Sequence, residues 1–370
     1  MKPSRATGRP ARQPATKRPA DFVTPPALVK ALVEVIGPPK VSRPRRIQAL
    51  AELFELFNRR RSEIRGMRYI DVPRLRDAYL RYHLPMNAAR SHYLLRHLVR
   101  FAPEVSELQD VVDLGCGPAT SSLATRFALP GPRRYTLVDR SRSALQIGRR
   151  LLSACAGEPS AVESVSTRVA QLPTFPRLPS KALVWLSMVL NELCVGTHHG
   201  PDGETFLERL KRLFEPGSVV IIIEPALRAA GRQLLRLHDL VLESGAWEIL
   251  APCTHQGSCP LLRAKGDPWC HFHFSWEAPA LVTDVARPLG LSWDTPAFSY
   301  LVLKRTDNPT LGSKKTGRVI GDPMDLRDGG RGAYVCQGAQ RRTVPLGKEP
   351  VHRGDVVKID GDHAQRVERW

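Results

Sequence analysis

The sequence predicts an α/β fold built on a parallel, Rossmann-like sheet, and three observations in one stretch support this prediction. A short apolar run at residues 111–112 ends in a glycine turn at residues 113–117. Residues 120–128 have the composition of a helix, and a second apolar strand at residues 135–138 ends in Asp139. Strand, turn, helix and parallel strand form the repeating unit of such sheets, and ligands bind outside the carboxyl ends of their strands.

The rest of the sheet follows in order along the chain. After Asp139 we expect a helix at residues 144–154, then strands at residues 165–169, 181–190 and 217–223. Within the last of these, Val219 to Ile223 is an unbroken apolar run, which is typical of a strand buried on both faces. From residue 279 the chain is expected to return to sheet, with residues 281–286 leading into a late antiparallel strand at 298–303.

Composition divides the chain into segments. Apolar residues fall at helical spacing from residue 26 until Phe101-Ala102-Pro103, and short strand-like runs dominate the last 60 residues or so. We therefore expect a basic disordered arm at residues 1–25 and an N-terminal helical subdomain at residues 26–103. An α/β domain should follow at residues 104–310, with a cysteine-rich insertion at 251–274, and a small β-rich C-terminal module at residues 311–370.

The chain is strongly basic. It has 55 lysine and arginine residues against 36 aspartate and glutamate residues, and a net charge of +19. A protein with this balance typically binds a polyanion such as nucleic acid. No apolar run approaches the roughly 18–20 residues that a membrane span needs, so no membrane association is expected. Seven cysteines, an odd number, favour a reducing compartment over a secreted disulfide scaffold.

The first 20 residues carry six basic residues and no acid. Such a segment buries too little apolar surface to fold alone. It can lie on nucleic-acid phosphates, act as a solubilising tail, or serve as an organelle transit peptide, and the sequence leaves these alternatives open.

The glycine turn is the first candidate binding site. Gly115 and Gly117 have no Cβ atom, so the backbone can turn tightly and approach a ligand closely. The third glycine of the dinucleotide fingerprint is missing, because Ser121 and Ser122 occupy that region. The D-L-G-C-G-P turn, with Asp139 at the end of the next strand, instead resembles class I S-adenosylmethionine methyltransferases. A Rossmann-like fold without a ligand is the alternative.

This resemblance implies an S-adenosylmethionine site at the strand ends. The glycine loop would pass beside the methionine part, and Asp139 would accept the ribose hydroxyls. Many members have an acid after the third strand to meet the adenine amine; here Gln171 stands in that region and can substitute with its amide. The expected cofactor-binding residues are Asp113, Gly115, Cys116, Gly117, Pro118, Asp139, Gln171, Asn191 and Glu192.

No residue is predicted to be catalytic. Asn191 and Glu192 follow the fourth strand, where class I enzymes place groups that face the transferred methyl; a helix N-terminal contact without chemistry is the alternative. The Asn/Asp-Pro-Pro-Tyr/Phe signature of methyltransferases that act on nucleic-acid amines is absent there. Pro252-Cys253 matches the Pro-Cys pair in which enzymes that methylate base carbons carry their cysteine nucleophile. Here the pair follows the fifth strand and belongs to a cysteine cluster.

That cluster predicts a metal site. Cys253, Cys259 and Cys270 are spaced C-x5-C-x10-C in a segment without helical periodicity, and Cys336 can supply a fourth thiolate. Loops of this composition are typically held by a metal, although the spacing leaves zinc and iron–sulfur equally open. Buried thiols without a ligand are the alternative, and packing is the role expected of Cys116, Cys155 and Cys194. Zinc could also use His255, His271 or His273.

Several motifs together resemble one family. Pro-Cys-x-His-x-Gly-x-Cys-Pro-Leu at 252–261, Trp-Cys-His-Phe at 269–272 and Leu-Asn-Glu-Leu at 190–193 are similar to the Rsm-type small-ribosomal-subunit methyltransferase-like family, which has mitochondrial members and bacterial relatives. The likeness covers roughly residues 75–360. It implies a class I methyltransferase fold that binds S-adenosylmethionine, a four-cysteine 4Fe–4S cluster, and association with the small ribosomal subunit during assembly. By this resemblance the cluster ligands are Cys253, Cys259, Cys270 and Cys336.

The function expected is therefore a monomeric assembly and translation factor that binds small-subunit rRNA, with methylation weak or absent. It would act in the bacterial cytoplasm or, alternatively, in the mitochondrial matrix. Two other functions remain open: an active RNA methyltransferase with a structural zinc, and a small-molecule methyltransferase.

Overall fold

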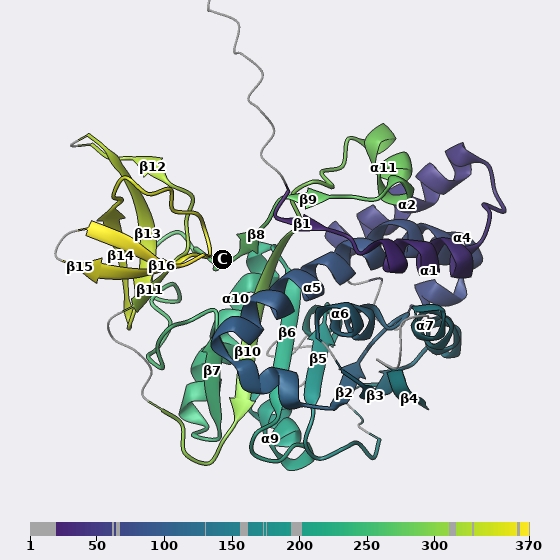
Figure 1. Ribbon diagram of the computed structural model, residues 1–370, viewed down its shortest axis with the longest axis horizontal. Coiled ribbons are helices and arrows are strands. Elements are labelled where there is room, and N and C mark those ends of the chain that lie inside the picture. Colours follow the sequence, from purple (N-terminus) through teal and green to yellow (C-terminus); the bar gives the residue numbers. More distant parts are fainter. Residues whose placement is uncertain are drawn as a thin grey trace, which may run out of the picture.

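The computed structural model describes residues 20–60, 63, 67–129, 131–155, 162–172, 174, 176–193, 202–310, 316–327, 329–360 and 363–369. Most of the predicted basic arm and Cys194 therefore lie outside the described residues. Figure 1 shows a central sheet with helices on both sides and a separate, smaller sheet formed by the C-terminal part of the chain.

The central sheet has the strand order β4-β3-β2-β5-β6-β10-β7, with β8 paired to β10. Strands β2 to β6 run parallel, and β10 is inserted antiparallel between β6 and β7. A parallel sheet in this order, with one antiparallel strand near its end, confirms the predicted α/β class with a Rossmann-like core. The strands are β2 Asp110–Leu114, β3 Arg133–Asp139, β4 Val162–Val169, β5 Leu183–Ser187, β6 Val219–Pro225, β7 Trp247–Ala251, β8 Phe272–His273 and β10 Ala297–Arg305.

The sheet is buried on both faces. In β6, Val219, Ile221 and Ile223 pack into one hydrophobic cluster, and Val220 and Ile222 pack into another on the opposite face. All five side chains are fully buried. This explains why the strand reads as an unbroken apolar run instead of an alternating one.

The N-terminal helices share a single hydrophobic cluster with the first face of the sheet. On that face lie α1 Pro26–Ile36, α2 Arg43–Asn58, α4 Pro73–Ala78, α5 Leu84–Phe101, α6 Thr120–Ala128 and α7 Arg142–Ala154. A π-helical turn, η2 Tyr79–His83, joins α4 to α5, and short 3-10 turns lie at Tyr69–Asp71, Pro103–Glu107 and Arg287–Leu289. The second face carries α9 Gly203–Leu213 and α10 Arg228–Glu243, and α8 Leu190–Leu193 follows β5.

One predicted element is wrong. Residues 281–286, expected to continue the sheet, lie within helix α11 Ala280–Ala286. Val282, Val285 and Ala286 fall at helical spacing and are buried. Just before α11, β9 Trp276–Glu277 pairs in parallel with β1 Phe22–Val23 from the start of the described chain.

The C-terminal sheet has its own small core. Its strands are β11 Thr316–Val319, β12 Met324–Asp325, β13 Arg331–Gln337, β14 Gln340–Pro345, β15 Val356–Asp360 and β16 His363–Glu368. They run in the order β12-β13-β11-β15-β16, with β14 on β13, around a cluster of mostly valine side chains. The domain boundaries proposed from composition stay predictions. Among the described residues, no helix combines the length and apolar character needed to cross a membrane.

Candidate functional site

The strand order locates the main site. The chain leaves β2 in one direction toward β3 and β4 and in the other toward β5 and β6, so the switch point lies between β2 and β5. A cavity of about 300 Å³ opens at the carboxyl ends of these strands. Five of the nine residues predicted from the sequence line it, namely Gly115, Gly117, Asp139, Gln171 and Glu192.

The glycine turn forms part of the cavity wall. Gly115 and Gly117 have φ angles of 68° and 52°, in the region that favours glycine. A Cβ atom on Gly115 would lie 2.7 Å from a methyl group of Val189, which follows β5. The turn can therefore approach the β5 exit only because this position has no side chain.

Asp139 connects the turn to the next helix. One carboxylate oxygen accepts a hydrogen bond from the amide of Gly117 at 2.9 Å, and the other accepts one from the amide of Ser141 at 2.8 Å. Burial raises the pKa of Asp139, and these two amides counteract part of that rise. Each oxygen keeps a further lone pair, so the carboxylate can still accept from a ligand hydroxyl.

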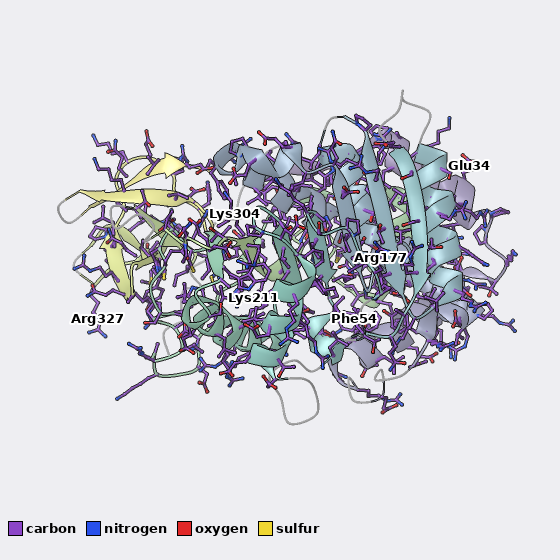
Figure 2. The ribbon with its side chains drawn as sticks, turned by 90° about the horizontal axis from the view of Figure 1, so that it is seen from below. Glu34, Phe54, Arg177, Lys211, Lys304 and Arg327 are labelled. Atoms are coloured by element: carbon purple, nitrogen blue, oxygen red, sulfur yellow. The ribbon has the colours of Figure 1, made fainter. Side chains whose placement is uncertain are left out.

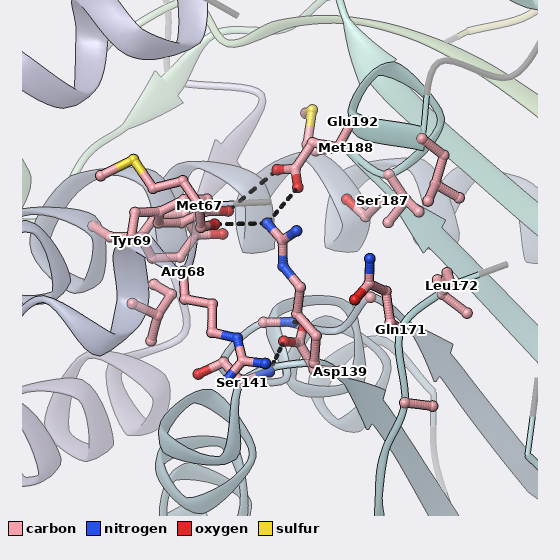
Figure 3. A pocket seen from close by; sticks show the side chains of 18 residues that line it. Met67, Arg68, Tyr69, Asp139, Ser141, Gln171, Leu172, Ser187, Met188 and Glu192 are labelled. Atoms are coloured by element: carbon pink, nitrogen blue, oxygen red, sulfur yellow. Dashed lines mark hydrogen bonds and ion pairs between the residues drawn. The ribbon is translucent and has the colours of Figure 1, made fainter. Parts of the chain in front are cut away.

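The opposite edge of the cavity comes from the N-terminal segment. Arg140 donates to the carbonyl of Met67 at 2.7 Å and pairs with Glu192 at 3.6 Å, while the Tyr69 hydroxyl donates to Glu192 at 3.3 Å. Figure 3 shows Met67, Tyr69 and Glu192 gathered along one edge, while Gln171 reaches in from another. Tyr79, on the π-helical turn, also lines the cavity.

Sequence reasoning did not name Met67, Tyr69, Tyr79 or Arg140 as site residues. The position of Arg140, directly after the acid at the end of β3, could have indicated that it lies at the site. The other three lie in the N-terminal helical segment, and only the packing of that segment onto the sheet brings them here.

Four predicted residues lie outside the lining. Asp113 is buried beneath the turn, where it accepts hydrogen bonds from the amide and hydroxyl of Ser122 at 3.0 and 2.8 Å. Burial raises the pKa of Asp113 to about 7 and that of Cys116 well above its usual value. The backbone of Pro118 lies close to Gly148 of α7, where an added Cβ atom would be only 3.1 Å from it. These contacts hold the turn against α6 and α7.

Asn191, the fourth, faces a buried carboxylate. Its amide donates to Glu224 at 2.5 Å, and the other oxygen of Glu224 accepts from the backbone of Leu190 at 2.8 Å. Glu224 is 1 % exposed at the end of β6. The chain turns sharply here, since Met188 has a φ of 61°. Glu224 thus fixes the β5 exit that carries Glu192 into the cavity.

The four predicted metal-binding cysteines line a second, smaller cavity of about 30 Å³. Cys253, Cys259 and Cys270 come from the loop between β7 and β8, and Cys336 comes from β13 of the C-terminal sheet. None of the four forms a disulfide bond. Burial raises the pKa of all four thiols, to about 12 for Cys336.

Arg318 ties the C-terminal sheet to this loop. Its guanidinium donates to the carbonyl of Pro252 at 2.7 Å and to that of Gly354 at 2.7 Å. The loop is also held from the core, because the amide of Cys259 donates to Asp239 at 2.8 Å and the Ser299 hydroxyl donates to the carbonyl of Cys270 at 2.8 Å.

The histidines considered as zinc ligands do not line the cavity. His255 lies 3.6 Å from the sulfur of Cys336. His271 and His273 face the C-terminal sheet, where they contact Arg353 and Asp322 at 3.0 and 3.3 Å. Among the described residues, no three His, Cys, Asp or Glu side chains form a ready-made site for a metal ion, so the metal centre stays a prediction. Cys116 and Cys155 are buried away from this cavity, as expected of packing residues.

Three known structures resemble the fold distantly. A precorrin-6y C5,15-methyltransferase from Geobacter metallireducens is 13 % identical, with a TM-score of 0.34, over 56 % of this chain and 87 % of that one. The plantazolicin methyltransferase in complex with SAH is 10 % identical, with a TM-score of 0.37, over 75 % and 99 %. An O-methyltransferase from Bacillus cereus is 10 % identical, with a TM-score of 0.33, over 58 % and 80 %. Similarity this distant carries no functional information.

Comparison with curated proteins finds no match. The model of one protein family does match, and the family is described as mitochondrial small ribosomal subunit Rsm22. The match runs from residue 76 to residue 344, from α4 through the glycine turn and the cysteine loop into the C-terminal sheet. Because it spans well over half of the chain, this protein belongs to the Rsm22 family.

Proposed function

We propose that this protein binds S-adenosylmethionine in the cavity at the ends of β2, β3 and β5, and acts on the small ribosomal subunit by binding its rRNA. The observation that carries the cofactor proposal is the convergence of Gly115, Gly117, Asp139, Gln171 and Glu192 on one cavity. Its volume of about 300 Å³ is within the usual range for small-molecule sites.

Each residue has a place in this proposal. The glycine turn would lie along the methionine part of the cofactor, where added side chains would collide. Asp139 would accept the ribose hydroxyls with the lone pairs that its two amide contacts leave. Gln171 would contact the adenine, and Glu192 would lie near the methyl group. Asp113 and Asn191 would hold the walls in place.

Family and charge support the ribosomal partner. The family description names the mitochondrial small ribosomal subunit, and the chain carries a net charge of +19. Figure 2 shows labelled basic side chains spread along the long axis, from Arg327 in the C-terminal sheet through Lys304 and Lys211 to Arg177. Lys304 and Lys211 are paired with Glu104 and Glu208, so the support for phosphate binding is the net excess of positive charge over the whole chain. The protein would act as a monomer, and the family description favours the mitochondrial matrix over a bacterial cytoplasm.

We further propose that Cys253, Cys259, Cys270 and Cys336 hold a 4Fe–4S cluster. In such a cluster each thiolate bonds a different iron, so the four sulfurs would have to enclose it from different sides. The support for this proposal is that all four cysteines line the same cavity. Four thiols and an otherwise mostly apolar lining suit a thiolate-preferring metal centre. Bound there, the cluster would join the cysteine loop to the C-terminal sheet. A structural zinc is the competing metal.

Two measurements test the proposal. Titration of the protein with S-adenosylmethionine is expected to show binding that Gln171→Ala weakens, and an absence of binding would defeat the cofactor claim. Crosslinking in cells is expected to recover small-subunit rRNA; crosslinks confined to tRNA or mRNA would defeat the ribosomal claim.

An active rRNA methyltransferase is the second candidate, favoured by the carboxylate of Glu192 at the edge of the cavity. Incubation of immature small subunits with labelled cofactor distinguishes the two. Transfer of label to rRNA that Glu192→Gln abolishes would establish catalysis, and no transfer would leave binding as the function.

A further inference from the structure

A third cavity lies where three segments that are distant in the sequence meet. Its volume is about 270 Å³, and its charged lining residues include Arg96 and Arg100 of α5, Arg369 after β16, and Asp21 before β1. Figure 1 shows the C-terminal end of the chain at the junction between the C-terminal sheet and the α/β core. We call this space the α5–C-terminal cavity.

Two arginines project from one face of α5. Arg96 and Arg100 are four residues apart, and both are exposed. Like charges at this spacing destabilise a helix by a few tenths of a kcal/mol. Within the described ranges no carboxylate forms an ion pair with either of them. The negative end of the helix dipole accounts for Arg100 in the last turn. Arg369, which follows β16, adds a third guanidinium to the same cavity.

The carboxylate in this cavity is already engaged. Asp21 accepts hydrogen bonds from the amide and hydroxyl of Ser275 at 2.9 and 2.8 Å, and its other oxygen pairs with Arg369 at 3.3 Å. It therefore holds Arg369 at the cavity and leaves Arg96 and Arg100 to face solvent. The resulting recess has an excess of positive charge.

The surroundings favour a fixed recess. Tyr93 lines the cavity and stacks on Phe274, with ring centroids 4.2 Å apart and an interplanar angle of 8°. Ala20 lines it from the other side, and the residues just before it in the sequence include Lys17 and Arg18. The basic N-terminal arm thus enters the described structure at this cavity.

We propose that the α5–C-terminal cavity binds phosphates of the RNA backbone. Guanidinium groups match phosphate oxygens with paired hydrogen bonds, and a recess admits a protruding backbone better than it admits a flat membrane surface. The inference rests on the proposed function, because it takes RNA as the partner, and it adds where the backbone of that RNA lies.

Binding of full-length protein to small-subunit rRNA over a range of salt concentrations tests the inference. The double variant Arg96→Gln/Arg100→Gln is compared with Arg149→Gln/Arg150→Gln, which removes the same charge from exposed positions on α7. We expect the first variant to bind about tenfold more weakly at low salt. The slope of log K against log salt should shrink by about 1.4, for two lost contacts to single-stranded RNA. Arg369→Gln should act in the same direction.

The outcomes separate the two proposals. Because removal of the Arg96–Arg100 repulsion should not lower thermal stability, a folded variant is expected. Equal affinity and slope for both double variants would overturn the cavity assignment and leave rRNA binding intact. No RNA binding by the unmodified protein would remove both. Loss of binding to vesicles containing phosphatidylserine, with RNA binding unchanged, would overturn the assignment in favour of a membrane.

Discussion

The guanidinium of Arg140 faces the carboxylate of Glu192 at the edge of the first cavity, with 3.6 Å between nitrogen and oxygen. The same guanidinium holds the carbonyl of Met67. Three parts of the chain therefore meet at one charge pair: the end of β3, the short helix after β5, and the N-terminal segment. Since the two side chains are 23 % and 29 % exposed, the pair is only partly solvated.

We expect this pair to contribute a modest coupling energy. In a double-mutant cycle, Arg140→Gln and Glu192→Gln should show a coupling on the order of 0.5–1 kcal/mol in the free energy of unfolding, because the contact is long and partly solvated. Urea denaturation of the four proteins measures it. Strict additivity would mean that the pair contributes nothing to stability.

Gly115→Ala should disrupt both the turn and the cofactor site. The residue has a positive φ and its new methyl group would collide with Val189, so we expect a loss of roughly 2–3 kcal/mol and no cofactor binding. Gly131→Ala is the matched control, since its φ is also positive, at 86°, but open space surrounds it. The control should cost about 1 kcal/mol and bind cofactor normally. Equal effects of the two changes would contradict a steric role for Gly115.

Asp113 should make stability depend on pH. Burial raises its pKa in the folded protein from 3.8 to about 7, so the folded state binds a proton more tightly than the unfolded state. The free energy of unfolding should therefore fall as pH rises from about 4 to about 7. Asp113→Asn should flatten this dependence, as seen in denaturation at several pH values. An unchanged slope in the variant would assign the dependence to other groups.

The cysteine cavity should hold iron and sulfide. Protein purified without oxygen is expected to be brown, and Cys253→Ser should lose the metal and make the C-terminal sheet more sensitive to protease, because metal binding contributes to folding. Cys155→Ala, a buried cysteine outside the cavity, is the control and should keep its metal. Metal analysis decides the identity, and a colourless protein with one zinc would refute the cluster.

The sequence alone was sufficient for the local part of the fold. The apolar runs, the glycine turn and the acid at the end of β3 predict the β2–α6–β3 unit and the strand ends where the first cavity opens, because each signal depends on neighbouring residues. Residues 281–286 show the limit of this approach. Their short apolar run is compatible with a strand as well as with a helix. Burial against the N-terminal helices favours the helix, α11.

Which side chains face the cavity was decided by tertiary structure. Asp113 lies in the same motif as Gly115, yet it points beneath α6 to Ser122, while Tyr69 reaches the cavity from a distant segment. Likewise, Cys336 joins the other three cysteines because the C-terminal sheet packs on the loop, where Arg318 is one of the residues that hold it. The residue types that form turns and the periodic spacing of apolar residues act over a few neighbouring residues, so a short stretch of sequence contains them. Contacts between segments far apart depend on how complete layers pack, which no single stretch of sequence specifies.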